Sequence, residues 1–111
     1  YCVNWFRNDE SGSFVWPGYG DNMRVLKWII DRLEGKATGQ QTMFGTAPQY
    51  AEINWSGIEF SAEQFAKVTS IDKAAWAEEF KLHDEHFAKL SYHLPKALLD
   101  TRADLEKRLA A

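Results

Sequence analysis

The chain has 111 residues, a formal net charge of −3, a single cysteine, and a composition that is 45% hydrophobic and 14% aromatic. That length fits one domain or part of one, and the aromatic content favours a folded core over disorder. The negative charge argues against a nucleic-acid partner, the lone Cys2 excludes an internal disulfide, and no apolar run approaches the roughly 18 residues that a membrane span needs.

The N-terminal residues predict a short β-hairpin. Residues 1–6 are rich in β-forming side chains, residues 8–13 form a polar turn, and residues 14–16 make a second short strand. The Pro17-Gly18 dipeptide ends the hairpin. We therefore expect the chain to begin with two paired strands.

A helix is predicted over residues 22–34. Asp21 and Asn22 are both good N-caps, and Gly35 is placed to end the helix in the left-handed conformation. Four apolar side chains at helical spacing predict one buried stripe on this helix. They are Leu26, Ile29, Ile30 and Leu33.

Residues 36–59 show no clear period and predict a long irregular loop that lies over other structure. Residues 61–111 predict a helical tail. Its first, short helix has capping-box spacing at Ser61 and Gln64. Two phenylalanines can form a hydrophobic staple beside that box: Phe60 and Phe65.

A second helix of the tail is predicted over residues 73–92, because apolar side chains repeat there at alternating steps of four and three. They are Trp76, Phe80, His83, Phe87 and Leu90. Pro95 suits the first turn of a last helix, and five of that helix's side chains share one face. They are Leu98, Leu99, Arg102, Leu105 and Leu109. These elements predict a mostly helical α+β fold with a short N-terminal β-hairpin, about four helices and an irregular loop.

Five aromatic rings fall within fifteen residues around the Pro17-Gly18 turn, which is more ring surface than a short loop needs for its own packing. One interpretation is a flat slot, in which Phe6, Phe14 and Tyr19 hold a planar base and Asn22 reads its edge. Stacking a base on an aromatic ring contributes about 1–3 kcal/mol. The alternative is that these rings fill the core under the hairpin, which is the usual place for aromatic side chains.

The polar groups at this turn favour a neutral base over a phosphate. Helix N-termini bind anions through free N–H groups, but Asp21 stands at this terminus and would repel one. Guanine offers two N–H donor groups on its reading edge, which backbone carbonyls or a side-chain amide oxygen can accept. Adenine lacks that pattern.

No other motif predicts chemistry. The run Gly35-Lys36-Ala37-Thr38 resembles the end of a phosphate loop, but Ile30 stands where the upstream glycine is needed and Ala37 replaces Ser or Thr. His83 and His86 are one helical turn apart, yet His83 falls in the apolar seam, so we predict no metal site. We assign no catalytic residue.

Residues 3–7 and 12–26 strongly resemble the GTP-dependent phosphoenolpyruvate carboxykinases. They read Val-Asn-Trp-Phe-Arg and Gly-Ser-Phe-Val-Trp-Pro-Gly-Tyr-Gly-Asp-Asn-Met-Arg-Val-Leu. In that family an Asn-Trp-Phe-Arg run precedes Phe-x-Trp-Pro-Gly-Phe-Gly-(Glu/Asp)-Asn-x-Arg-Val-Leu at this spacing. Looser agreement covers essentially all 111 residues, which correspond to the C-terminal end of a family chain several times longer. The start at Tyr1 rather than Met also favours a piece of a longer protein.

The resemblance implies an enzyme that converts oxaloacetate and GTP to phosphoenolpyruvate, GDP and carbon dioxide. Such an enzyme is a cytoplasmic lyase of gluconeogenesis that uses manganese or magnesium, and it acts as a monomer. By resemblance, Phe6 and Tyr19 sandwich the guanine and Phe14 approaches it edge-on, while the following turn contacts the base through backbone and amide groups. The implied nucleotide-binding residues are Phe6, Phe14, Tyr19, Gly20, Asp21 and Asn22.

The resemblance also implies which part of the full-length enzyme binds the base and which part carries the catalytic groups. Residues 1–22 become the guanine-binding hairpin and turn of a larger α/β nucleotide-binding domain, and Tyr19 keeps the ring of the family's usual Phe. The family's phosphate loop, metal ligands, oxaloacetate-binding arginines and mobile lid all lie upstream of Tyr1. We therefore expect the isolated chain to be inactive, with the upstream part of the same enzyme as its partner. The alternative is an independent helical protein-interaction module with an aromatic hairpin.

Overall fold

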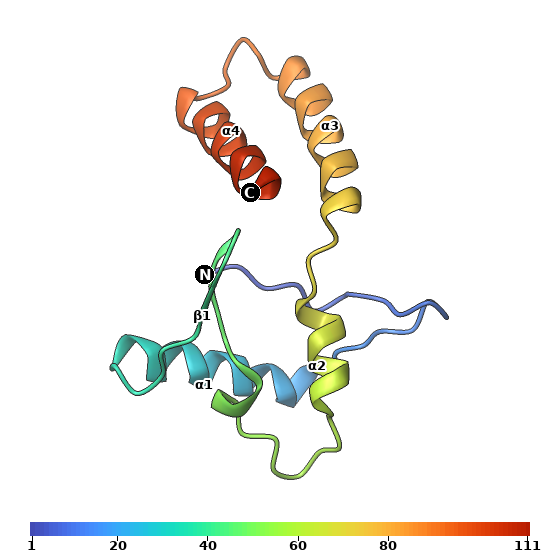
Figure 1. The fold of residues 1–111 in the computed structure, drawn as a ribbon, viewed down its shortest axis with the longest axis vertical. Helices are drawn as coiled ribbons and strands as arrows, with labels where there is room; N and C mark the ends of the chain where they lie inside the picture. The colour runs from blue at the N-terminus through green and yellow to red at the C-terminus, as the bar shows by residue number, and fades with distance from the viewer. The chain divides into compact units, whose positions relative to one another are not determined.

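The computed structural model describes residues 1–111, which divide into two compact units (Figure 1). The first unit comprises Tyr1–Thr42 and Thr46–Ser70, and the second comprises Met43–Gly45 and Ile71–Ala111. Four α-helices, one two-stranded antiparallel sheet and two 3-10 helices make up the regular structure. The predicted α+β, mostly helical class is confirmed, and the two 3-10 helices are additions that the sequence patterns did not predict. No helix is both long and apolar enough to cross a membrane.

The first helix, α1 (Asn22–Leu33), begins and ends close to its predicted bounds. The 3-10 helix η1 (Tyr19–Asp21) leads into it, and Gly35 follows it with φ at +76°, as a left-handed helix stop requires. The predicted end signal is therefore confirmed.

The predicted buried stripe of α1 is wrong, because Leu33 is 83% and Ile30 is 55% exposed. The buried side chain is Trp28, and Val25 and Ile29 pack beside it on the same core. These three positions have the same helical spacing as the predicted stripe. The tryptophan decides between the two faces, since it buries the larger apolar area and its indole N–H finds an acceptor in Glu52 at 3.0 Å.

The predicted N-terminal hairpin forms only at its turn: an antiparallel bridge joins Asn8 to Phe14, and the Asp9 and Val15 amides donate to the Ser13 and Arg7 carbonyls at 2.9 Å, but residues 1–6 form no strand. Beyond this bridge, side-chain acceptors take several of the amide N–H groups of the segment. The Asp9 carboxylate accepts from the amides of Ser11 (2.9 Å) and Ser13 (3.0 Å), and the Phe6 amide donates to its neighbour Asn4.

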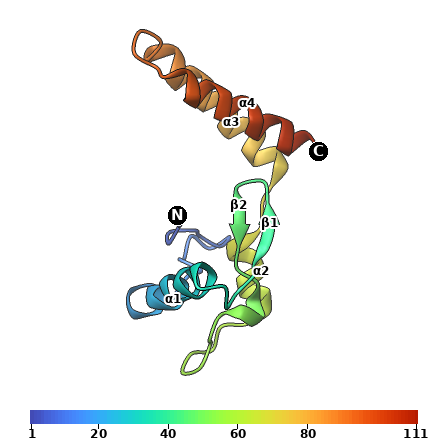
Figure 2. The ribbon, with the colours of Figure 1, turned by 90° about the vertical axis from the view of Figure 1, so that its left-hand side faces the viewer.

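The two-stranded sheet lies instead within residues 36–59, which we predicted to be irregular. It pairs β1 (Gln40–Thr42) with β2 (Gly45–Ala47), and the 3-10 helix η2 (Tyr50–Glu52) follows (Figure 2). Gly39 makes the entry to β1 possible. Its φ is +68°, and a Cβ atom there would lie 2.6 Å from the Cγ2 atom of Thr46.

The core of the first unit is aromatic. Its buried members are Trp16, Trp28, Ile53, Phe60 and Phe65. The helix α2 (Ala62–Thr69) adds Phe65 to this core, and its capping box is confirmed: Ser61 Oγ accepts from the Gln64 amide, and Gln64 Oε1 accepts from the Ser61 amide. Both predicted staple residues are buried in this core.

The second unit contains α3 (Lys73–Lys89) and α4 (Lys96–Ala110), which run side by side (Figures 1 and 2). The predicted ring seam of α3 forms, with Trp76, Phe80 and His83 in successive contact at centroid distances of 5.9 and 6.0 Å. On α4, Arg102 is buried with its guanidinium 4.2 Å from the Phe80 ring centre. The shared face of α4 is therefore centred on a cation–π contact, while Leu98 and Leu99 stay about half exposed.

Candidate functional site

The three rings predicted to form a slot lie at the surface. Phe6 is 70%, Phe14 is 64% and Tyr19 is 96% exposed. The alternative that these rings fill the core is therefore wrong for them, although it holds for Trp16, which is 5% exposed. Phe6 and Phe14 meet edge to face, with ring centres 5.8 Å apart and planes at 61°. Tyr19 has no ring contact with either of them.

The backbone of Tyr19 is strained. Its φ is +44°, the only positive value at a non-glycine residue, and the preceding Gly18 has φ at +81°. A left-handed conformation costs a residue with a Cβ about 1–2 kcal/mol. The exposed ring gains nothing from packing within the chain that would offset this cost. Strain of this kind gathers at ligand sites, where the surrounding structure enforces it.

The turn after Tyr19 is held by ionic and backbone contacts. The Asp21 carboxylate pairs with the Arg24 Nε atom at 2.8 Å, and the Asp21 amide donates to the Gly18 carbonyl at 3.1 Å. The Arg24 guanidinium also donates to the carbonyls of Asn54 and Ser56, so it ties α1 to the loop that follows η2. The negative charge of Asp21, which we expected at the helix N-terminus, is thus paired with Arg24.

Asn22 has a fixed orientation. Its Oδ1 atom accepts a hydrogen bond of 2.7 Å from the Trp16 indole Nε1. An indole nitrogen can only donate, so the amide oxygen, and not the amide nitrogen, faces Trp16. The Nδ2 group makes no hydrogen bond within the chain. The group that Asn22 offers to a ligand is therefore its Nδ2 donor. The sequence analysis had also allowed the amide oxygen to accept a hydrogen bond from the base.

Glu52 is an organising residue that the sequence analysis missed. Its carboxylate accepts hydrogen bonds from the amides of Gly39 (2.9 Å), Gln49 (3.1 Å) and Thr38 (2.9 Å), and from the Trp28 indole. These bonds, those from the Gly39 and Gln49 amides first, lower the pKa of Glu52 from its usual 4.5 to about 2. Its one local signal is the Gln49-x-x-Glu52 capping-box spacing, which the sequence analysis did not use, and the other donors lie 13 to 24 residues away at Thr38, Gly39 and Trp28.

The Glu52 carboxylate also accepts hydrogen bonds from two amides at the end of the run that resembles a phosphate loop. The Thr38 and Gly39 amides, which a phosphate loop would offer to its ligand, already donate to this internal anion. Gly35 instead ends α1, and the Lys36 amide donates back to the Asp31 carbonyl at 2.7 Å.

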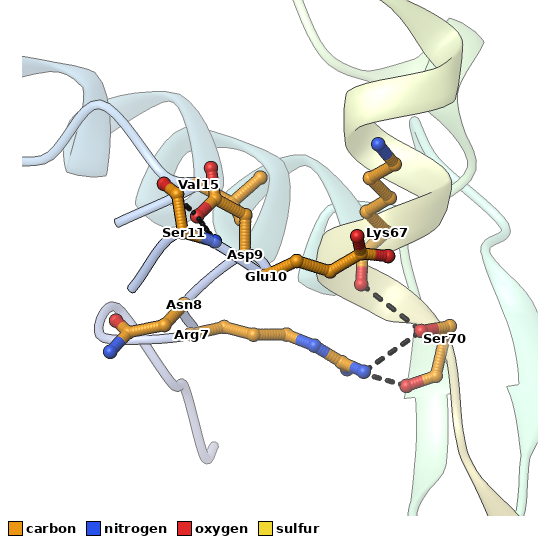
Figure 3. Close-up of a pocket in the computed structure, with 8 residues that line it drawn as sticks. All are labelled: Arg7, Asn8, Asp9, Glu10, Ser11, Val15, Lys67 and Ser70. Atoms are coloured by element: carbon orange, nitrogen blue, oxygen red, sulfur yellow. Dashed lines mark hydrogen bonds between the residues drawn. The ribbon is translucent and has the colours of Figure 1, made fainter. Parts of the chain in front are cut away.

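A cavity of about 450 Å³ lies between the N-terminal loop and the C-terminal end of α2 (Figure 3). Arg7 crosses it and donates to the Ser70 carbonyl at 2.6 Å and to the Ser70 hydroxyl at 2.9 Å. A third bond reaches the Val68 carbonyl at 3.3 Å. The arginine of the N-terminal motif therefore caps α2, since cationic side chains stabilise the last carbonyls of a helix.

His83, one of the two histidines considered as metal ligands, contacts an aromatic ring and a carboxylate on its own helix. The His83 ring stacks on Phe87 at a centroid distance of 6.4 Å, and its Nε2 atom lies 3.4 Å from Glu79. No group of three or more His, Cys, Asp or Glu side chains in the chain is arranged to hold a metal ion.

Comparison with known proteins identifies what this chain is similar to. The profile of a family described as "Phosphoenolpyruvate carboxykinase C-terminal P-loop domain" matches residues 1–108. The chain is 43% identical to "Phosphoenolpyruvate carboxykinase [GTP]" of Anaeromyxobacter sp. (strain K) over 111 residues, which are all of this chain and 19% of that protein. It is 41% identical to the protein of the same name from Treponema pallidum (strain Nichols) over 110 residues, 98% of this chain and 18% of the relative. The chain thus spans about a fifth of the length of these relatives.

Proposed function

This chain belongs to the GTP-dependent phosphoenolpyruvate carboxykinase family, within its C-terminal P-loop domain, and from that premise we propose that it supplies the guanine-binding slot of such an enzyme. In this proposal the whole enzyme is a cytoplasmic lyase of gluconeogenesis. It converts oxaloacetate and GTP to phosphoenolpyruvate, GDP and carbon dioxide. This chain binds the base, and the rest of the enzyme carries out the chemistry.

The observation that carries the proposal is the strained, exposed Tyr19. Its ring is 96% exposed on a left-handed backbone, and the same N-terminal segment carries the exposed Phe6–Phe14 pair and the Asn22 amide, whose Nδ2 group makes no hydrogen bond within the chain. An exposed ring of this kind offers a face for stacking a purine, a contact that contributes about 1–3 kcal/mol. Arg24 pairs with Asp21 and keeps the turn in place, so that little ordering is left to occur on binding.

The metal that phosphoryl transfer requires does not fit this chain. The transferred phosphoryl group needs cationic charge close to its oxygens. The His83–Glu79 contact lies on α3 in the second unit, and no three potential ligands gather anywhere in the chain. We therefore assign manganese or magnesium to the rest of the enzyme, and we expect the isolated chain to form no phosphoenolpyruvate.

The test compares two substitutions of Tyr19 in the intact enzyme. Tyr19→Ala removes the stacking face and should lower kcat/KM for GTP, ITP and ATP alike, by about ten- to a hundredfold. Tyr19→Phe keeps the ring and should be nearly silent. Tyr92→Ala is the matched control, because Tyr92 is also 90% exposed but lies in the second unit. Unchanged kcat/KM in Tyr19→Ala would contradict the proposal.

The independent interaction module is the less supported function. The match to the carboxykinase family covers nearly the whole chain, and the relatives are about five times longer. The exposed apolar side chains of α1, Ile30 and Leu33, suit packing against the remainder of such a protein as well as they suit a separate partner.

A further inference from the structure

We propose that Trp16 is a positioning residue that sets the hydrogen-bonding polarity of the base site. Its buried indole N–H fixes the Asn22 amide so that the amide donates to the base, which makes the slot select 6-oxopurines over 6-aminopurines. The inference rests on the proposed guanine-binding function and adds to it the residue that determines which purine is accepted.

The first step is the direction of the Trp16–Asn22 hydrogen bond. The bond is 2.7 Å long and joins a group that can only donate to the Oδ1 atom of Asn22. Turning the amide over would set its NH₂ group against the indole N–H, and two donors would then face each other. A partly buried donor left without an acceptor is unfavourable, so the amide keeps one orientation.

The second step is the immobility of Trp16 itself. Its ring lies 5.8 Å from Trp5, 6.1 Å from Trp55 and 5.5 Å from Phe60, centre to centre. It is 5% exposed and belongs to the buried core of the first unit. The indole N–H therefore has a fixed position in the fold. Its hydrogen bond to Asn22 fixes the orientation of that side chain at the start of α1.

The third step is the chemistry of the base edge. The Asn22 Nδ2 group has no partner within the chain, so it can donate to a ligand atom that accepts. Position 6 of guanine and of hypoxanthine is a carbonyl oxygen, which accepts. Position 6 of adenine is an amino group, which donates and would meet another donor. Asn22 in this orientation therefore favours GTP and ITP equally and disfavours ATP.

The test measures kcat/KM for GTP, ITP and ATP with variants of the intact enzyme. Trp16→Phe keeps an aromatic ring in the core but removes the donor, so the amide of Asn22 can turn. The ratio of GTP to ATP should fall by about tenfold or more, and the ratio of GTP to ITP should not change. In an Asn22→Ala background, Trp16→Phe should have no further effect on the first ratio.

The matched control is Trp55→Phe. Trp55 packs against the same core and stacks on Phe60, which Trp16 also contacts, but its indole N–H donates to the Tyr50 carbonyl at 2.9 Å, away from Asn22. This variant should lose thermal stability while keeping the wild-type ratio of GTP to ATP. Equal ratios in Trp16→Phe and Trp55→Phe would overturn the inference.

A second variant covers the case in which Trp16→Phe does not fold. Asn22→Asp keeps an oxygen for the Trp16 donor and turns the group that faces the base from a donor into an acceptor. It should shift the preference from GTP toward ATP, and an unchanged preference would overturn the inference. If Asn22→Ala alters the ratio and Trp16→Phe does not, only the role of Trp16 fails. If neither Asn22→Ala nor Tyr19→Ala alters nucleotide use, the proposed function fails.

Discussion

Replacing Gly39 by alanine tests the close packing among β1, β2 and α1. Gly39 has φ at +68°, and an added Cβ would lie 2.6 Å from Thr46 Cγ2, 2.8 Å from the Ala47 carbonyl oxygen and 3.0 Å from Trp28 Cζ2. The left-handed backbone alone costs alanine about 1–2 kcal/mol. The contacts add about 1–3 kcal/mol, because a backbone oxygen and a buried indole cannot move aside. We expect Gly39→Ala to lower the free energy of unfolding by about 2–5 kcal/mol.

The matched control for this prediction is Gly57→Ala. Gly57 has φ at +85° but nothing within 4 Å of the added Cβ, so it should lose only the backbone contribution. The assay is thermal unfolding followed by tryptophan fluorescence. At this chain length each 1 kcal/mol shifts Tm by about 4–8 °C, so Gly39→Ala should melt at least about 4 °C below the control. Thr46→Ser, which removes Cγ2, should recover part of the loss. Equal Tm values for the two alanine variants would refute the packing argument.

Three further predictions concern other contacts. The pKa of Glu52 is lowered to about 2 in the folded chain, so its contribution to stability is full above pH 4.5 and is lost as the pH falls toward 2. Urea unfolding at pH 7 and pH 3 should therefore show that the free energy of unfolding falls less on acidification in Glu52→Gln than in the wild type. Arg102→Lys gives up the planar contact with Phe80 and the fork to Asp84 and Glu106, so it should lower the stability of the second unit by about 1–2 kcal/mol, measured by hydrogen exchange in α3 and α4. Leu33→Glu should reduce self-association of the isolated chain in sedimentation experiments, because Leu33 is 83% exposed, and a wild-type chain that is monomeric would contradict this.

The elements that the sequence predicted correctly depend on neighbours in the chain. The capping box of Ser61 and Gln64 closes over three residues, and the helix stop at Gly35 requires only its own φ. The ring seam of α3 follows from helical spacing alone. Each of these signals is complete within one or two turns, so a single sequence contains all the information that they need.

The errors arose where a distant partner decides. Two faces of α1 have the same apolar spacing, and the larger apolar area of Trp28, together with the acceptor that Glu52 offers 24 residues away, favours the tryptophan face. The N-terminal hairpin is a separate, local case: its pairing stops at the Asn8–Phe14 bridge, and the Asp9 carboxylate takes the Ser11 and Ser13 amides. Within the candidate site, the sequence identified the aromatic rings but could not tell that Trp16 is buried while Phe6 and Tyr19 are exposed.

Three tryptophans of the first unit have two roles at once. Trp16, Trp28 and Trp55 supply apolar area to one core, and each indole N–H donates to a different segment: Asn22 at the start of α1, the Glu52 carboxylate, and the Tyr50 carbonyl. The turn at the candidate site therefore takes its orientation from the core. A packing change around Trp16 should then alter which purine is accepted before it unfolds the chain, because a rotation of the ring moves the donor that holds Asn22 while most of the buried area is retained.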